Sequence, residues 1–591
     1  MKKVVSAEEI ACVIVTLDAL IEVGNFRKAL ERQGAELQKV GGRKAVLAQL
    51  DQLSASQPAL AAHAAATLAE LAMYLGRTPA AEPLLGRYRS DAGFLDLAIP
   101  TRAKLQMAEY LHLTRATPDA VKMTQELKDR LTEAMRKAVT VKDLKAQCQI
   151  VRDLGDCDCM LATLYSRQHR YQMAERAYEE GLAQLYTHEE GLARVYARVP
   201  AASKRALQWR LGLLMLIGGY GRWRVGQLTT ASNRLHQARD YLQATGDFIR
   251  HGAVALGMGC VHRSLGAYDQ ALTDFLDAGR RYAERGAADR HEANMVRAWM
   301  NEGVTHQALA STKEQEQEKR DCLQKADQAL QRAEELASRL NNPWLTAEVC
   351  IRRNWYYLDA AVKEPWKGLD EAHKALQQGR LITSDLLIFE ANIALGNAYL
   401  QLADDPRAAQ HCPDLTLEQC PSEAEKCFVA AFEKAQQLRA GKFIVEAHLA
   451  LADLYCHLPR RLLLAQDHYS QAKAELEREP NDFLDKKAEK IATVLARVSN
   501  EIFRVDARHP VFKDSEPSGL KDLIHELQQW TIARAAAQTH FNKTAMARKL
   551  RVSRVGLDKL IKRHFGPEGL RALDVRPEAP ASGVPVLSPP V

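Results

Sequence analysis

The chain has 591 residues and a formal net charge of +7, and 11 of its residues are cysteines. This length exceeds what one hydrophobic core usually supports, so several units or an elongated array are expected. The scattered cysteines argue against a disulfide framework and for a reducing cytosol. The longest apolar run, residues 211–220, has half the length of a membrane span, and acidic residues interrupt the N-terminal run that a signal peptide needs. We therefore expect a soluble, cytoplasmic protein.

The first 500 or so residues are rich in Ala, Leu, Glu, Gln, Arg and Lys, which predicts α-helices throughout. Between about 90 and 150 the sequence predicts helix and nothing finer. Repeat-like patterns of glycine, alanine and large apolar residues occur before that, at Leu17, Gly24, Phe26 and Ala29, and at Leu68, Ala69, Gly76, Ala81 and Leu85.

A clearer internal repeat follows, and its best copy contains Gly259, Gly266, Tyr268, Ala271, Phe275 and Ala278. Small residues allow two antiparallel helices to cross closely, and large residues fill the gap to the next pair. Six more copies share an Ala, a large residue four positions later and a small residue three after that: Ala174/Tyr178/Gly181, Ala231/Leu235/Ala238, Ala326/Leu330/Ala333, Ala372/Leu376/Gly379, Ala424/Phe428/Ala431 and Ala465/Tyr469/Ala472.

This pattern resembles the tetratricopeptide repeat. The expected fold is all-α: a tetratricopeptide-like α-solenoid of antiparallel helix pairs over residues 1–503, weakest over 90–150. Successive alanines are 40 to 57 residues apart, so the units are long or carry insertions, and residues 312–320 and 404–421 are the two visible candidates. The concave side of such an array binds a protein, a peptide or a small effector.

One dense cluster of basic and aromatic residues is a candidate ligand groove in this array. It consists of Arg352, Arg353, Asn354, Trp355, Tyr356 and Tyr357. The alternative is that these side chains pack between repeats, with the arginines on the surface.

The C-terminal part is organised differently. Residues 504–518 contain Pro510 and Pro517, are followed by Gly519 and are predicted to be a linker, and a helix is predicted over 520–538. Residues 521–571 hold 11 Lys and Arg against four acidic residues, a balance of +7 that equals the charge of the whole chain. A neutral body with one basic end indicates that polyanion binding is delegated to that end. The Pro-rich tail, 573–591, is expected to be disordered.

Two short helices are predicted within the basic segment, over 544–550 and 553–564. Ala545, Met546 and Leu550 of the first and Leu557, Leu560 and Ile561 of the second form one apolar side, and basic residues lie outside it. This is the layout of a helix-turn-helix, whose second helix fits the DNA major groove.

Residues 519–572 resemble the Fis-type helix-turn-helix domain of bacterial transcription regulators. The matching residues are Asn542, Thr544, Ala545, Met546, Leu550, Ser553, Arg554 and Leu557. The sequence departs from the family at Phe541 and Arg551, where Gly is usual, at Gly556, where Thr is usual, and at Asp558, where a basic or aromatic residue is usual.

The resemblance implies a transcription regulator that binds duplex DNA and is nucleoid-associated when bound. Ser553, Arg554 and Lys559 would contact base edges or lie beside them, and Lys543, Lys562 and Arg563 would neutralise phosphates. Thr544, Gly556 and Asp558 complete the predicted surface. A homodimer is expected, with residues 520–538 as the candidate contact.

Catalytic motifs are absent from the sequence: there is no phosphate loop, no His-Glu-x-x-His and no nucleophile elbow. Gly218, Gly219 and Gly221 lie within a helical repeat, and the cysteines lack the spacing of a zinc site. No enzyme activity, cofactor or metal is expected. The alternative to a regulator is a non-catalytic protein-interaction scaffold with a degenerate helix-turn-helix, which Asp558 favours; an RNA- or nucleoprotein-associated factor is a third possibility.

Overall fold

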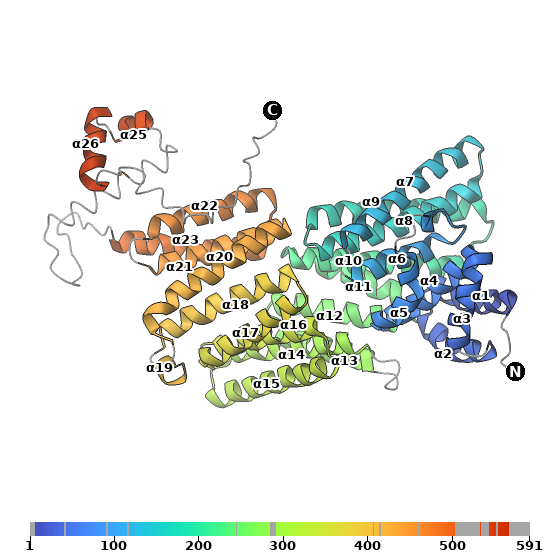
Figure 1. The fold of residues 1–591 in the computed structure, drawn as a ribbon, viewed down its shortest axis with the longest axis horizontal. Coiled ribbons are helices and arrows are strands. Elements are labelled where there is room, and N and C mark those ends of the chain that lie inside the picture. The colour runs from blue at the N-terminus through green and yellow to red at the C-terminus, as the bar shows by residue number, and fades with distance from the viewer. Residues whose placement is uncertain are drawn as a thin grey trace. The chain divides into compact units, whose positions relative to one another are not determined.

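The computed structural model describes residues 6–40, 43–89, 93–114, 117–243, 245–283, 291–405, 407–412, 415–458, 461–502, 532, 543–550 and 554–565. These residues form helices, and there is no strand among them (Figure 1). The chain divides into two compact units, residues 1–458 with 465–494, and residues 459–464 with 495–591. The predicted linker 504–518, the predicted helix 520–538 apart from Ile532, and the tail 573–591 lie outside the described residues.

The first unit is a tetratricopeptide-like α-solenoid. Its N-terminal helices are α1 (Ala7–Glu22), α2 (Phe26–Lys39), α3 (Arg43–Ser56), α4 (Pro58–Tyr74), α5 (Thr78–Leu85), α6 (Thr101–Leu113) and α7 (Thr117–Thr140), with 3₁₀ turns η1 (Gly86–Tyr88) and η2 (Phe94–Asp96). The segment 90–150, predicted only to be helical, thus contains η2, α6, α7 and the start of α8.

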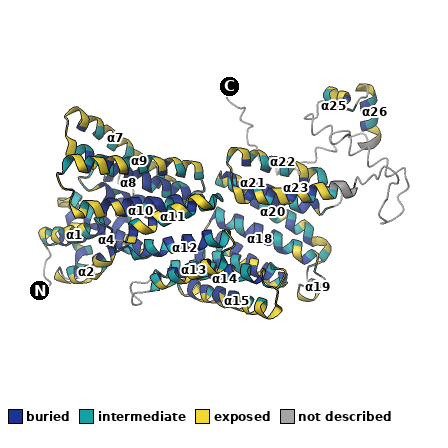
Figure 2. Ribbon diagram, turned by 180° about the vertical axis from the view of Figure 1, so that it is seen from behind, coloured by how far each residue is buried: buried dark blue, intermediate teal, exposed yellow. Residues whose placement is uncertain are grey.

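The repeat region follows as α8 (Leu144–Arg167), α9 (Tyr171–Val195), α10 (Ala201–Arg224), α11 (Leu228–Gln243), α12 (Phe248–Ser264), α13 (Tyr268–Ala283), α14 (Glu292–Ala310), α15 (Glu316–Arg339), α16 (Pro343–Leu358), α17 (Pro365–Leu381), α18 (Asp385–Ala403), α19 (Ala408–His411), η3 (Leu417–Gln419), α20 (Cys420–Leu438), α21 (Gly441–Cys456), α22 (Leu462–Arg478) and α23 (Asp482–Ile502). Neighbouring helices pack in pairs, including α8 with α9, α10 with α11, and α12 with α13. Buried residues line the faces between them (Figure 2). Of the expected insertions, 312–320 includes the first turn of α15, and 404–421 holds α19 and η3.

The pair α12–α13 illustrates why the repeat residues have their identities. A Cβ atom on Gly259 would lie 2.6 Å from Cε1 of Phe275, so the helices can cross this closely only at glycine. Ala271, Phe275 and Ala278 are buried, and Gly266 turns the chain between the helices with φ of +79°. The alanines of the six other copies are also buried, which confirms the predicted repeat positions.

A cluster of aromatic side chains, Phe26, Tyr74 and Trp209, packs the N-terminal helices against the repeats. The ring of Phe26 stacks on Tyr74 with centroids 4.1 Å apart. The hydroxyl of Tyr74 and Nε1 of Trp209 donate hydrogen bonds to the buried carboxylate of Asp247, at 2.6 and 2.8 Å. A buried carboxylate is tolerated because its oxygens are satisfied in this way.

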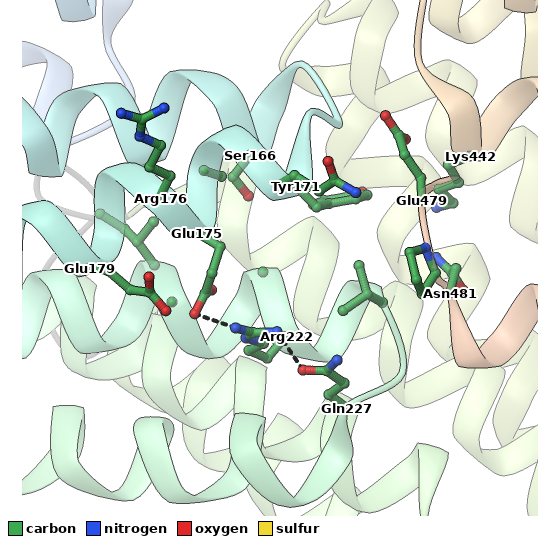
Figure 3. Close-up of a pocket in the computed structure, with 17 residues that line it drawn as sticks. Ser166, Tyr171, Glu175, Arg176, Glu179, Arg222, Gln227, Lys442, Glu479 and Asn481 are labelled. Carbon is green, nitrogen blue, oxygen red and sulfur yellow. Dashed lines mark hydrogen bonds and ion pairs between the residues drawn. The ribbon is translucent and has the colours of Figure 1, made fainter. Parts of the chain in front are cut away.

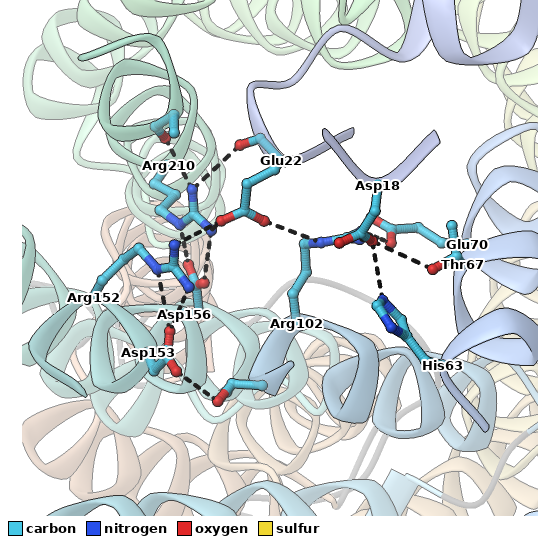
Figure 4. A network of polar contacts seen from close by, with 12 residues as sticks. Asp18, Glu22, His63, Thr67, Glu70, Arg102, Arg152, Asp153, Asp156 and Arg210 are labelled. Atoms are coloured by element: carbon cyan, nitrogen blue, oxygen red, sulfur yellow. Dashed lines mark hydrogen bonds and ion pairs between the residues drawn. The ribbon is translucent and has the colours of Figure 1, made fainter. Parts of the chain in front are cut away.

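A polar network lies between α1, α4, α6, α8 and α10 (Figure 4). Arg102 pairs with Asp18, Glu22 and Glu70, and Arg210 pairs with Glu22 and with Asp156. Burial acts to raise the pKa of Glu22, but the charges of Arg210, Arg152 and Arg102 outweigh burial and lower this pKa to about 2. Because the removal of one partner would leave a buried charge unpaired, the network fixes the packing of these helices.

Helices α9 and α10 contact the turn between α22 and α23, which comes much later in the chain, and we call this contact the seam. The amide nitrogen of Asp482 donates a hydrogen bond to the oxygen of Val225 at 2.9 Å, and Nε2 of Gln172 donates to the oxygen of Arg478 at 2.7 Å. The rings of His169 and Phe443 meet edge to face, 4.5 Å apart. The turn between α22 and α23 is therefore held against α9 and α10.

Helix α18 is long and apolar enough to cross a membrane, but just over half of that stretch, 56%, is buried inside the array. All 11 cysteines are free thiols, and most of them are buried among apolar side chains. Both observations are typical of core positions in a helical array.

Candidate nucleic-acid interface and partner sites

The second unit contains the helix pair predicted at the basic end of the chain. It comprises α25 (Lys543–Lys549) and α26 (Arg554–Phe565), which lie within one residue of the predicted bounds. Met546 and Leu557 are fully buried between the two helices, and Ile561 and Ile532 join them. Leu550 and Leu560 pack at the edge. Ala547, which the sequence had not singled out, is buried more deeply than Ala545.

The other side of this pair is polar and largely basic. Ser553 lies outside the described residues, and Gly556 is half-buried. The side chains at the remaining predicted DNA-binding positions are all exposed: Lys543, Thr544, Arg554, Asp558, Lys559, Lys562 and Arg563.

Asp558 does not act as an isolated negative charge on this surface. Its Oδ1 accepts a hydrogen bond from Nζ of Lys543 at 2.8 Å, across the two helices. Within the described part of the chain, Arg554, Lys559, Lys562 and Arg563 have no carboxylate partner. The exposed face of α26 therefore presents these four unpaired cations around the neutral Lys543–Asp558 pair. Val555 on the same helix is an apolar side chain that is 67% exposed.

The predicted ligand-groove cluster occupies α16, where its residues divide between two environments. Asn354, Tyr356 and Tyr357 are buried, and Nδ2 of Asn354 donates a hydrogen bond to the oxygen of Gly368 at 2.8 Å. Arg352 lies over the ring of Trp355, which is 43% exposed, at 4.1 Å from the ring centroid.

Arg353 belongs to the packed part of the cluster. Its guanidinium pairs with Glu334 at 3.2 Å and with Glu371 at 3.6 Å, and its Nη2 donates to the hydroxyl of Tyr357 at 2.6 Å. Consecutive helical residues point about 100° apart, so a dense run of them cannot line one groove. Arg352 and Trp355 are the members left accessible.

A cavity of about 380 Å³ lies at the seam (Figure 3). Segments distant in sequence border it, since α9 and α10 provide one side and residues 442 and 479–481 the other. Its polar lining includes Tyr171, Glu175, Glu179, Arg222, Lys442, Glu479 and Asn481. Gly218 and Gly221 of the glycine cluster also border it, and a Cβ atom on Gly218 would lie 2.5 Å from Cε2 of Tyr178, which explains a glycine at this position.

The charges in this cavity are partly paired. Glu175 pairs with both Arg222 and Arg234. Burial acts to raise the pKa of Glu175, but the two arginines outweigh burial and lower this pKa. Burial and the charge of Glu475 raise the pKa of Glu479. No local sequence pattern marks this site, because its two sides are about 250 residues apart in the chain. Among the described residues, no group of three or more His, Cys, Asp or Glu side chains is placed to hold a metal ion.

No family model matches the chain, and no curated protein matches it. Solved structures do match. BtubC (BKLC) from P. vanneervenii is 14% identical with a TM-score of 0.30, and the match covers 53% of this chain and 93% of that one. The APC/C hetero-tetramer Cut9-Hcn1 is 11% identical with a TM-score of 0.30, covering 80% and 95%. A circular tandem repeat protein with novel repeat topology is 13% identical with a TM-score of 0.17, covering 84% and 99%.

Proposed function

We propose that this protein binds duplex DNA through α25 and α26 and regulates transcription, while the helical-repeat array docks a protein partner. The observation that carries the proposal is the division of α26 into two sides. Leu557 and Ile561 are buried, whereas Arg554, Lys559, Lys562 and Arg563 are exposed and unpaired within the described residues. A helix with this division can enter a major groove with its cations toward the duplex.

The positions of these cations support separate roles. Arg554 is the first residue of α26, and the first turn of a recognition helix is where base edges are contacted. Lys562 and Arg563 lie two turns later, where contacts to phosphates position the helix. The pair between Lys543 and Asp558 removes the repulsion that a free carboxylate would exert on DNA.

One helix of this kind reads few base pairs, so we propose that the protein acts as a homodimer on half-sites roughly 34 Å apart. Docking of a protein partner on the array would link that partner to the bound DNA. The helical-repeat fold supports this role, because paired helices present extended surfaces for protein contacts. A cytoplasmic location, with association to the nucleoid when DNA is bound, belongs to the same proposal.

The test uses the full-length protein and a duplex selected from a random pool. Arg554→Ala should weaken binding to this duplex by about 1–3 kcal/mol and relax sequence preference. Lys562→Ala should weaken all duplexes alike and reduce the slope of log K against log salt by about one. Arg280→Ala, at an exposed position of α13, is the control. If neither variant changes duplex binding by more than twofold relative to this control, the proposal is wrong.

A second candidate function is a protein-interaction scaffold in which α26 docks on a protein. Val555 favours it, since an exposed apolar side chain beside the Lys543–Asp558 pair also suits a protein interface. Lack of duplex binding by a full-length protein that keeps its helical circular dichroism would support this candidate. Binding to single-stranded RNA in preference to duplex would instead indicate a nucleoprotein role.

A further inference from the structure

Five arginines lie on alternate helices of the array, and printed side-chain contacts join each of these helices to the next: Arg224 to Ser166, Trp223 to Ser264, Arg263 to Asn301 and Arg297 to Glu348. The five are Arg167 at the end of α8, Arg224 at the end of α10, Arg263 in the last turn of α12, Arg297 in α14 and Arg352 in α16. Desolvation and the charges of Arg297 and Arg224 lower the pKa of Arg167 against the opposing charge of Glu109, although the Arg167 side chain is exposed to solvent. Burial and the charge of Arg352 lower the pKa of Arg263. The five arginines thus follow a line of contacting helices, and we call them the arginine cluster.

Most of these guanidinium groups have no carboxylate partner. Arg297 pairs with Glu348 at 3.5 Å. Nη1 of Arg224 donates to the main-chain oxygen of Ser166 at 3.0 Å, and Arg352 lies over Trp355.

Nη1 of Arg263 donates to Oδ1 of Asn301 at 2.8 Å. Arg167 makes no hydrogen bond or ion pair within the described residues. Arg167, Arg224 and Arg263 lie at helix C-termini, where the helix dipole supplies a partial negative charge of only about one half to offset each guanidinium. Crowded cations without counter-ions are costly, so the cluster is poised to accept an anion.

The carboxylates around the cluster do not balance it. Glu109, Glu348, Glu390 and Glu446 act on its members or on each other. Burial, reinforced by Glu348 and Glu446 and opposed by Arg352 and Lys442, raises the pKa of Glu390 to about 7. Even with all four of these acids ionised, the five arginines and Lys442 leave a surplus of two positive charges.

We propose that the arginine cluster docks an acidic peptide segment of the partner protein. The proposal rests on the partner-docking role of the array and names the chemistry of the partner. Carboxylates spaced along an extended peptide would supply the counter-ions that Arg167, Arg224 and Arg352 lack. The exposed ring of Trp355 would pack against apolar residues between them.

A peptide fits this region better than a nucleic acid does. Glu109 acts on Arg167, and Glu446 acts on Glu390 beside Arg352, so acidic groups accompany the cations and disfavour a ligand that carries a negative charge on every residue. A peptide places its carboxylates at intervals and presents neutral or apolar groups between them. A region of mixed charge therefore favours a peptide in which acidic residues alternate with neutral or apolar residues.

The experiment measures fluorescence anisotropy of a labelled ten-residue peptide of alternating Glu and Leu, titrated with the full-length protein. A peptide of alternating Gln and Leu is the neutral control. We expect the acidic peptide to bind and Arg167→Gln and Arg352→Gln each to weaken it by about tenfold. Arg280→Gln on α13 should change it by less than twofold.

Thermal unfolding separates docking from a structural role. Because Arg167 lacks a counter-ion, Arg167→Gln should leave the melting temperature unchanged or raise it while peptide binding falls. Equal binding of the two peptides, or equal binding by wild type and Arg167→Gln, would overturn the proposal. So would displacement of the acidic peptide by a single-stranded oligonucleotide that binds more tightly. Arg554→Ala should leave peptide binding unchanged, so failure of the DNA proposal is detected separately.

Discussion

Asn481 and Arg224 are 257 residues apart in the sequence, yet Nδ2 of Asn481 donates a hydrogen bond to the main-chain oxygen of Arg224 at 3.2 Å. The same side chain also caps α23, because its Oδ1 accepts hydrogen bonds from the amides of Phe483 and Leu484, both at 3.2 Å. One buried amide therefore begins the last helix of the array and closes the seam.

Replacement of Asn481 by Asp separates these two roles. Asn481→Asp keeps the capping oxygens but removes the donor and places a carboxylate beside the oxygen of Arg224. We expect the free energy of unfolding to fall by about 1–3 kcal/mol and the amide of Asp482 to exchange faster. Denaturant unfolding and hydrogen-exchange mass spectrometry measure the two effects.

Asn342→Asp is the matched control. Asn342 caps α16 through Oδ1, which accepts from the amides of Trp344 and Leu345. A carboxylate at that helix N-terminus should be neutral or slightly stabilising. If the two Asp variants are equally stable, the hydrogen bond across the seam contributes nothing.

The close crossing of α12 and α13 can be tested with two glycines. Gly259→Ala would force Phe275 to move, since the new Cβ would lie 2.6 Å from its ring, and we expect a loss of about 1–3 kcal/mol in the free energy of unfolding. Gly279→Ala on α13 meets no atom within 4 Å and should gain up to about 1 kcal/mol from helix propensity. Opposite signs in denaturant titrations support the crossing; equal effects of both variants contradict it.

These examples also mark what could be predicted from the sequence. Gly259 and Phe275 could be placed because the small and large residues that define a helix crossing recur at fixed spacing. The two sides of α26 could be placed for a similar reason, since Leu557 and Ile561 follow the helical period. Local patterns thus determined the helix pairs and the exposed basic face.

The seam and the arginine cluster could not be predicted in this way. Arg167 and Arg352 look like ordinary surface residues, because they are related only through the stacking of the helices that lie between them and not through a local pattern. The dense segment around Trp355 is the opposite case, because its sequence indicates a site more strongly than its structure does. It looked like a site, but the helical period directs Asn354 and Tyr356 into the core.

His448 and His468 predict a loss of stability in acid. Their Nδ1 atoms are 2.8 Å apart, so one ring must donate and the other accept. Burial and the charge of His468 lower the pKa of His448 to about 4, and burial lowers the pKa of His468. Both pKa values lie below the unfolded value near 6.5. The unfolded state therefore binds more protons between about pH 6.5 and pH 4, and stability falls as the pH falls through this window.

His448→Gln should reduce this acid sensitivity by on the order of 2 kcal/mol between pH 6.5 and 4.5. The free energy of unfolding at the two pH values gives the measurement. His457→Gln, which replaces an exposed ring following α21, is the control for the loss of one histidine. Identical pH profiles for His448→Gln and wild type would contradict the assignment.

Glu390 predicts the opposite pH dependence. Its pKa is raised to about 7, mainly by burial, so the folded state binds more protons than the unfolded state between about pH 4.5 and 7, and stability falls as the pH rises through that window. Glu390→Gln should raise the free energy of unfolding at pH 8 by about 1–3 kcal/mol, with little change at pH 4.5. Glu433→Gln, at an exposed position of α20, should alter neither value. A gain at pH 8 no larger than that of the control would show that Glu390 ionises freely.

The ion pair between Lys543 and Asp558 makes a last prediction about DNA binding. Asp558→Asn removes the carboxylate that engages Nζ of Lys543 and frees this cation for a phosphate. We expect duplex affinity to rise several-fold at low salt and the salt slope to steepen by about one contact. Asp240→Asn is the control, because it removes one exposed negative charge from α11 of the array. If the two variants have the same affinity and salt slope, the pair does not face the DNA, and α26 must bind its target through another surface.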